Sequence, residues 1–348
     1  MLAPKLICVL IAERGAADFV ISTLLDLAKE QNRYRLRIYV PLLVYNFLTK
    51  SHGQLISDAE IKVYDSELKK SQIAEISDAH CLLSSATSKK AELQFSTIAK
   101  VDAIPIVHVV DAFYGYRKRM LFLGKVYHFE KIIVIDDEAK KEAVAEGLPP
   151  ESMVSLGHPG WEAISKNKLI AVRRKNKLTR NTIFFGAPIK RDYKNTLGFC
   201  EDDAWSLLVG SWKFFPDLFE NVIYCPHPQQ TEIPQLHGAE LVEYNPDLFI
   251  NFNQIFGIFS APLIHAALLG CISISLQPVK NKKDVCAFSR RGFVWRATTS
   301  EEIRVLLEKS SMLNCGQLLK ELDGSSSRLQ KLIEEHAVNK CISAEQNV

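Results

Sequence analysis

Short apolar runs alternate with longer stretches of helical period along most of this chain. That alternation predicts βαβ units and a parallel sheet. At the start of the chain, the apolar run 6–12 predicts a strand, the segment around Gly15 a turn, and the apolar spacing over 19–30 a helix. Further strands of this half are predicted at the apolar runs 35–40, 80–86, 104–110 and 131–136, of which 131–136 is expected to be the last. We therefore expect an N-terminal Rossmann-like domain over 1–165.

A second series of alternating elements follows a basic segment. From Asn167 to Arg180 the chain carries lysines and arginines and no acidic residue, which predicts a linker over 166–180. A second Rossmann-like domain is predicted over 181–325, and a loosely determined C-terminal helix or tail over 326–348. Its strands are expected at 181–187, 221–228, 253–260 and 271–276, with a helix over 202–215. The predicted fold class is α/β, with two doubly wound domains that face a crevice.

Composition fits this picture. The 348 residues are 47% hydrophobic and 24% charged, which is typical of a globular chain of two domains. A formal charge of +3 gives no reason to expect a nucleic-acid partner. The eight cysteines are scattered without metal-ligand spacing, which predicts no metal site and suits free thiols in a cytoplasmic protein.

Two apolar segments raise the question of a membrane. The run after Lys5 is too short for a signal-peptide core and is interpreted as the first strand. The uncharged run 248–279 is long enough to cross a bilayer, but Asn251, Gln254 and His265 interrupt it. Because such groups are unfavourable in lipid, a transmembrane helix is not expected there.

Ligands of open parallel sheets bind beyond the carboxyl ends of the strands, so the loops that follow strands are where chemistry is sought. Asp111 follows the run 104–110 directly, and Glu13 and Asp18 flank Gly15 in the first loop. Each of these three acids is a candidate general base or acid. The alternative for each is a helix cap.

The segment around Ser260 has the form of an anion site. Ser260 ends a predicted strand at an N-cap position, Ala261 follows, and Pro262 occupies the first helical turn. Free backbone N–H groups and the helix dipole favour a phosphate there. Gly186, in the loop that ends the strand predicted over 181–187, is a further candidate for nucleotide binding. Simple capping by Ser260 is the alternative.

His227 and Pro228 follow the strand predicted over 221–228, with Pro226 before them. Prolines on both sides stiffen the backbone, so the imidazole is presented at a fixed place. A protonated His227 could neutralise a leaving phosphate, which is why it is both a candidate catalytic residue and a candidate nucleotide ligand, together with Pro228. The alternative is a loop histidine that caps a carbonyl group.

Basic residues supply further candidates. Arg117 and Arg119 lie beside Tyr114 and Tyr116, and they could bind an acidic sugar, a phosphorylated lipid acceptor or an anionic membrane face. A solvated helix face is the alternative. His158, between Gly157 and Gly160, is a further candidate for anion binding, although this segment is expected to act mainly as a hinge.

Three of these segments carry a resemblance to known proteins. The stretch 130–164 resembles the interdomain crossing of glycosyltransferases with the GT-B fold and of the related nucleotide-sugar 2-epimerases. The stretch 256–278 resembles their donor-nucleotide loop and helix, and 222–230 is similar to the "HP motif" of bacterial sialyltransferases. The resemblance implies that Ser260, His227 and their neighbours contact a nucleotide.

The chain also departs from these families. His265 stands where their helix usually carries a glutamate that binds ribose hydroxyls, and the further paired acids of a hydrolysing 2-epimerase are not seen. A neutral His265 could still donate one hydrogen bond to a nucleotide. The alternative places its side chain in the apolar helix face with Leu268 and Leu269.

The resemblance implies a bacterial glycosyltransferase of surface-polysaccharide or lipopolysaccharide biosynthesis. It would move a sugar from a nucleotide-sugar donor, such as a CMP-linked acidic sugar, to a saccharide or lipid-linked acceptor. No metal and no organic cofactor are expected, because His227 and the Ser260 helix would neutralise the leaving phosphate. The alternatives are a nucleotide-sugar 2-epimerase or hydrolase and a non-catalytic nucleotide-sugar-binding protein. A homodimer and peripheral contact with the inner face of the plasma membrane stay open.

Overall fold

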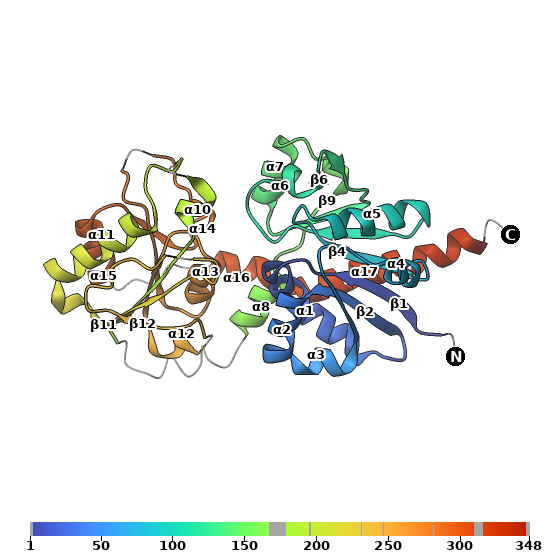
Figure 1. Cartoon of the computed structure of the whole chain (residues 1–348), viewed down its shortest axis with the longest axis horizontal. Helices are drawn as coiled ribbons and strands as arrows, with labels where there is room; N and C mark the ends of the chain where they lie inside the picture. The colour runs from blue at the N-terminus through green and yellow to red at the C-terminus, as the bar shows by residue number, and fades with distance from the viewer. Residues whose placement is uncertain are drawn as a thin grey trace. The chain divides into compact units, whose positions relative to one another are not determined.

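A computed structural model describes residues 3–166, 179–194, 196–230, 232–245, 247–280, 282–309 and 316–345. Contacts divide the chain into two compact units, unit 1 (Met1–Ala163 and Glu321–Val348) and unit 2 (Ile164–Lys320), which are labelled by element in Figure 1. Each unit has a parallel sheet with helices, so the predicted α/β fold class is confirmed. Most of the basic linker predicted over 166–180 lies outside the described residues.

Unit 1 contains a seven-stranded sheet in the order β3-β2-β1-β4-β5-β8-β9, and every neighbouring pair is parallel. Its strands are β1 (Lys5–Leu10), β2 (Tyr34–Pro41), β3 (Glu60–Tyr64), β4 (Cys81–Ser85), β5 (Ile106–Val109), β8 (Lys131–Val134) and β9 (Met153–Ser155). The central strands β1, β4 and β5 are buried almost throughout, which explains their continuous apolar runs. The expectation that 131–136 is the last strand was wrong, because the short strand β9 pairs beyond it.

The helices of unit 1 connect and cover these strands (Figure 1). They are α1 (Arg14–Lys29), α2 (Leu42–Ser51), α3 (Gly53–Asp58), α4 (Lys70–Ile76), α5 (Lys90–Val101), α6 (Tyr116–Arg119), α7 (Asp137–Ala145), the 3-10 turn η1 (Pro150–Ser152), α8 (Pro159–Ser165) and α17 (Ser325–Glu345). A small antiparallel hairpin joins β6 (Leu121–Phe122) to β7 (Lys125–Val126). α7 begins where Asp136 accepts a 2.6 Å hydrogen bond from the Ala139 N–H, an N-cap that its sequence favours.

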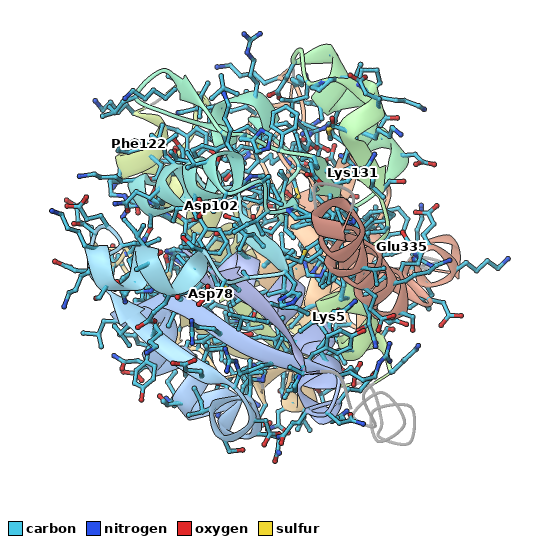
Figure 2. The ribbon with its side chains drawn as sticks, turned by 90° about the vertical axis from the view of Figure 1, so that its right-hand side faces the viewer. Lys5, Asp78, Asp102, Phe122, Lys131 and Glu335 are labelled. Carbon is cyan, nitrogen blue, oxygen red and sulfur yellow. The ribbon has the colours of Figure 1, made fainter. Side chains whose placement is uncertain are left out.

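A loosely determined helix or tail was expected over 326–348, and the structure has the helix α17 there, with buried side chains. In α17, which Glu335 marks in Figure 2, Leu329, Ile333 and Ala337 are fully buried. Helix α17 packs against α1, and the hydroxyls of Thr23 and Ser326 lie 2.9 Å apart. These buried positions are spaced by four residues, so the helix has the apolar stripe of a packed element.

The N-terminus of α17 is bound by a buried acid from the segment that follows β9. Glu162 accepts hydrogen bonds from the Gly324 N–H at 2.7 Å and from the Ser326 N–H at 2.8 Å. Its side chain therefore satisfies N–H groups that have no partner inside the helix. A carboxylate is also the favourable charge at this end of the helix dipole.

Unit 2 contains a six-stranded sheet in the order β12-β11-β10-β13-β14-β15, again parallel throughout. Its strands are β10 (Asn181–Phe185), β11 (Glu220–Cys225), β12 (Glu240–Leu241), β13 (Gln254–Gly257), β14 (Ile272–Leu276) and β15 (Trp295–Ala297). The helical elements are α10 (Ile189–Tyr193), α11 (Glu201–Phe214), η2 (Pro216–Leu218), α12 (Leu248–Asn251), α13 (Ala261–Leu268), α14 (Ala287–Arg290), α15 (Ser300–Glu308) and α16 (Gly316–Leu322), which precedes α17.

An aromatic cluster forms part of the core of unit 2. The Tyr224 ring lies 5.0 Å from that of Trp205 and 5.5 Å from that of Phe184, and all three side chains are buried. The uncharged run 248–279 divides among α12, β13, α13 and β14. In the part of the chain that the structure describes, no helix has the length and apolar character needed to cross a bilayer.

Candidate functional site

In unit 1 the candidate acid Glu13 lies beyond β1, where the strand order reverses, and Asp111 lies beyond β5 of the same sheet. β1 is the centre from which the chain first builds outward through β2 and β3 and then in the other direction through β4 and β5. The loops after β1 and β4 therefore diverge at the carboxyl edge of the sheet, which is where ligands bind in open α/β sheets. Glu13 follows β1 and Asp111 follows β5.

Asp111 is held by Arg119. The Arg119 Nη1 atom lies 3.4 Å from Asp111 Oδ1, and the two side chains are 16% and 12% exposed. The same guanidinium donates to the carbonyl oxygens of Tyr114 and Ala86. Two residues that sequence reasoning assigned to different roles, catalysis and acceptor binding, thus form one ion pair.

Asp18 lies in α1, near the ion pair of Asp111 and Arg119, and its carboxyl group has a raised pKa. Burial raises its pKa to about 6, Arg14 opposes the shift, and the negative charge of Asp111 adds to it. Burial likewise raises the pKa of Asp111, although Arg119 works in the other direction. The pair of aspartates therefore holds protons more readily than ordinary carboxyl groups do, a property suited to proton transfer near neutral pH.

Glu13 contacts a different cation. Its carboxylate lies 3.0 Å from Lys89 Nζ, and both side chains are about half exposed. Glu13 occupies the N-cap position of α1 but makes no side-chain capping bond, so its carboxylate is directed to Lys89 instead. The capping alternative is therefore not what the structure shows for this residue.

Sequence reasoning missed the loop after β4, which supplies Lys89. A fully buried carboxylate, Glu92, shapes this loop by accepting hydrogen bonds from the N–H groups of Thr87 and Lys89, the Ser85 hydroxyl and the Tyr127 hydroxyl. The rule that picked out Asp111 also applies here, because a predicted strand ended just before this loop. Its residues were not among the candidates taken from the sequence.

His158 and Arg117 do not join this cluster. His158 is 3% exposed, its ring stacks on Trp161 at 4.2 Å, and its Nδ1 accepts from the Trp161 N–H at the start of α8. This placement gives His158 a packing and capping role in place of an exposed anion-binding position. Arg117 is exposed on α6, where its backbone N–H donates to Glu146.

Unit 2 gathers three of the predicted loops at the ends of neighbouring strands. β11, β10 and β13 are adjacent in the sheet, and they are followed by the His227, Gly186 and Ser260 segments. Gly186 is required by a close approach: a Cβ at this position would lie 2.3 Å from Gln230 Oε1 and 2.7 Å from the Tyr224 hydroxyl oxygen. The Gln230 amide donates a 2.8 Å hydrogen bond to the Tyr224 hydroxyl, which holds the loop after β11 against its own strand.

His227 is part of a tight turn. Its Nδ1 accepts a 3.2 Å hydrogen bond from the Gln229 N–H, and its carbonyl oxygen accepts from the Gln230 N–H at 2.8 Å. The neighbouring Pro228 is exposed. With Nδ1 acting as an acceptor, a neutral His227 ring carries its proton on Nε2.

Ser260 precedes α13 in the extended conformation of an N-cap residue, but its hydroxyl makes no capping bond. The Oγ atom is buried and has no hydrogen-bond partner among the described residues. Burying such a group without a partner is unfavourable, so a polar ligand would gain from meeting it. Ala261, which is exposed, and Pro262 are the first two residues of α13.

His265 lies on the buried side of α13. Its side chain is 9% exposed, and Leu263, Ile264 and Ala266 around it are fully buried. The packed position considered for it from the sequence is thus the one that the structure shows.

A cavity of about 260 Å³ lies beside the loops after β10 and β11. Its walls include Gln229, which lies in the segment 222–230 considered above, and Lys190 and Arg191, which were not candidates from the sequence. Arg191 Nη2 donates to Gln229 Oε1 at 2.8 Å, and Lys190 Nζ lies 2.5 Å from Asp202. Lys190 and Arg191 follow Gly186 by four and five positions, so their charge and their place after a predicted strand could have identified them.

No protein-family model matches this sequence, and no curated protein matches it either. The likeness of His227 and Pro228 to the sialyltransferase motif is therefore not confirmed.

Solved structures do resemble this chain. UDP-GlcNAc 2-epimerase from Neisseria meningitidis bound to UDP-GlcNAc is 12% identical with a TM-score of 0.63, over 95% of this chain and 100% of its own. UDP-GlcNAc 2-epimerase from Methanocaldococcus jannaschii is 13% identical with a TM-score of 0.58, over 89% of this chain and 93% of its own. HepE from Anabaena in complex with UDP is 11% identical with a TM-score of 0.55, over 99% of both chains.

These neighbours correct one expectation and support another. The glycosyltransferase that was expected as the main activity is contradicted, because the neighbours described by an activity are 2-epimerases, which fit the alternative. At such low identity the likeness concerns the fold. The chain thus has the GT-B-like fold of two parallel-sheet α/β units.

Proposed function

We propose that this protein is an enzyme that binds a UDP-linked hexosamine and inverts the sugar at C2, as a nucleotide-sugar 2-epimerase does. The observation that carries the proposal is the cluster of Asp18, Asp111 and Arg119 at the strand ends of unit 1, where burial raises the pKa of both aspartates. The solved structures with this fold that are described as bound to UDP or UDP-GlcNAc support the class of ligand.

Inversion at C2 requires that a proton leave one face of the carbon and that a proton return to the other. The C2–H bond is not acidic by itself, so its cleavage is coupled to loss of the nucleotide from C1. The C2–H electron pair then forms a C1–C2 double bond, while the C1–O pair departs with UDP. Addition of UDP and a proton to that double bond regenerates the nucleotide sugar with C2 inverted.

Asp111 and Asp18 are proposed to exchange the C2 proton. A carboxyl group whose pKa is raised toward neutrality can both accept and return a proton in that range. Arg119, paired with Asp111, fixes the orientation of its carboxylate and supplies positive charge nearby. Glu13 is proposed as an auxiliary acid, held by Lys89.

Unit 2 is proposed to recognise the nucleotide. The unpartnered Ser260 hydroxyl and the first turn of α13 would meet a phosphate, because that turn presents backbone N–H groups at the positive end of the helix. His227 would donate from Nε2 to the departing diphosphate, and Gly186 allows its loop to approach closely. Pro228 stiffens the His227 turn.

The test is incubation of the protein with UDP-GlcNAc in D₂O. We expect deuterium to enter at C2 and a second C2 epimer to accumulate, both visible by proton NMR, with little free UDP. Asp111→Asn and Asp18→Asn should abolish exchange, whereas Asp65→Asn, which removes an exposed carboxylate from another part of unit 1, should not.

Other outcomes would identify the alternatives. Release of UDP and free sugar without C2 exchange would indicate a hydrolase. A rise in melting temperature with UDP-GlcNAc but no chemical change would indicate a non-catalytic binding protein. Neither binding nor exchange with any UDP-linked hexosamine would overturn the proposal.

A further inference from the structure

Unit 1 carries an amphipathic surface that the proposed chemistry does not use. We infer that the β6–β7 hairpin and the end of α5 bind an anionic lipid surface, with the apolar hairpin tip inserted among the lipids and the surrounding lysines on their headgroups. This surface comprises lysines and exposed apolar residues of α5, α6 and the hairpin: Lys100, Val101, Lys118, Leu123, Lys125 and Val126. β6 and α5 contact each other and lie close together in Figure 1, and Phe122 of the hairpin is labelled in Figure 2.

The tip of the hairpin exposes a leucine under conformational strain. Leu123 is 85% exposed and has φ +47°, and it is followed by Gly124 at φ +78°. Two-residue turns of this kind favour Asn, Asp or Gly, because a side chain such as leucine is unfavourable in the left-handed region. An exposed leucine at this turn serves neither the turn conformation nor the core of unit 1. Its apolar side chain is available to an apolar environment outside the molecule.

Further apolar side chains surround the tip. Val126 of β7 is 59% exposed and Val101 at the end of α5 is 75% exposed. Between α5 and the hairpin runs a groove of about 540 Å³. Its lining includes Leu93 and Val101 of α5, Val126 of β7 and Phe129 from the segment after β7. Exposed apolar groups grouped in this way mark interaction sites more often than scattered ones do.

Positive charges predominate beside these apolar groups, although Asp102 follows Val101 at the end of α5. From Ala112 to Phe129 the sequence contains Arg117, Lys118, Arg119 and Lys125 and no acidic residue. Lys100 and Lys125 line the groove, and its lining includes no acid. Whereas Arg119 pairs with Asp111, no carboxylate of the described residues forms an ion pair with Lys100, Lys118 or Lys125.

An anionic bilayer is the partner that fits this combination. Its headgroups complement unpaired lysines, and its acyl region accepts a protruding leucine, an arrangement that resembles peripheral membrane attachment. An acidic protein would meet the lysines equally well, but it would need a preformed pocket for the protruding tip. A fluid lipid surface needs none.

The first test is sedimentation with vesicles. The full chain is mixed with vesicles of phosphatidylcholine alone or of phosphatidylcholine with phosphatidylglycerol, at low and at high salt. We expect binding only to vesicles that contain phosphatidylglycerol, and weaker binding at high salt, because salt screens the lysines. Equal binding to both kinds of vesicle, or binding to neither, would overturn the inference.

Variants then locate the contact. Lys118→Ser and Lys125→Ser should each weaken partition about fivefold, and Leu123→Ser about tenfold. The matched controls are Lys213→Ser and Phe214→Ser, which remove an exposed lysine and a 77% exposed apolar side chain from α11 of unit 2. Circular dichroism confirms that each variant is folded.

The pattern of losses decides the outcome. Losses in the hairpin variants with unchanged controls support the inference, and equal losses in both sets would refute it. Because C2 exchange on UDP-GlcNAc in solution is measured without vesicles, a failure of lipid binding leaves that result unaffected. The two proposals can therefore fail separately.

Discussion

Gly15 brings the first turn of α1 against the carboxylate of Asp111: a Cβ added at residue 15 would lie 2.2 Å from Asp111 Oδ2. The glycine backbone is therefore what allows the two segments to approach so closely. Any side chain at this position must displace the carboxylate or the helix.

Gly15→Ala is expected to reduce kcat/KM for C2 exchange about a hundredfold, because a displacement of about 1 Å at a reacting group has effects of that size. Gly53→Ala is the matched control, since a Cβ there meets nothing within 4 Å. Steady-state kinetics on both variants provide the measurement. Wild-type kinetics for Gly15→Ala would remove Asp111 from the proposed reaction.

The raised pKa of Asp18 predicts how the stability of the folded chain changes with pH. Its pKa is raised from 3.8 to about 6 in the folded chain, so between about pH 4 and pH 6 the folded state binds more protons than the unfolded state. Stability contributed by this group is present below pH 4 and is lost as pH rises through 6. Asp18→Asn should therefore melt above the wild type near neutral pH, with the difference vanishing toward pH 4.

Thermal unfolding across that range measures the effect, and Asp65→Asn serves as the exposed control. A difference between Asp18→Asn and the wild type that is constant with pH would show that the gain has another origin.

Ser260 and Thr299 both occupy N-cap positions, but only the Thr299 side chain caps its helix. Thr299 Oγ1 accepts from the Glu302 N–H at 3.2 Å, whereas the buried Ser260 hydroxyl has no such bond. Ser260→Ala should leave the free energy of unfolding unchanged or slightly higher and weaken UDP binding about tenfold. Thr299→Ala should lower the free energy of unfolding by about 1 kcal/mol and leave UDP binding unchanged.

Urea unfolding and calorimetric titration of UDP measure these two effects. Loss of stability without loss of affinity in Ser260→Ala would assign its hydroxyl to the fold alone.

Glu162 is expected to matter for stability and not for chemistry. Replacing it with Ala leaves the N–H groups of Gly324 and Ser326 without their partner, which should lower the free energy of unfolding by about 3 kcal/mol. Glu162→Gln retains one acceptor oxygen and should lose less. Urea denaturation compares the two variants, and equal losses would mean that packing of the side chain, and not hydrogen bonding, is what matters.

The sequence predicted those parts of the fold that local pattern determines. Strands such as β1 and β5 are buried on both faces and so read as apolar runs, whereas β3 is partly exposed, with polar residues such as Glu60 and Lys62, and was not recognised. Asp111 was found because it directly follows such a run. Lys89 was not, because its partner Glu13 lies 76 positions away and only the fold brings them together.

Tertiary contacts also explain the other differences. The burial of α17 depends on α1, a helix about three hundred positions earlier, and no local pattern reports such a pairing. The spacing of Leu329 and Ile333 was compatible with a packed helix, but it could not show which element packs against that helix. From the sequence, His265 could either contact a nucleotide or pack in the apolar face of its helix, and only the burial of the residues around it separates the two.

Because unit 1 joins Met1–Ala163 to Glu321–Val348, its fold can be completed only after all of unit 2 has been synthesised. On the ribosome, every residue of unit 2 emerges before the helix that covers α1. Domains generally fold as units during synthesis. The continuous unit 2 can therefore fold while the face of α1 that packs against α17 is still uncovered.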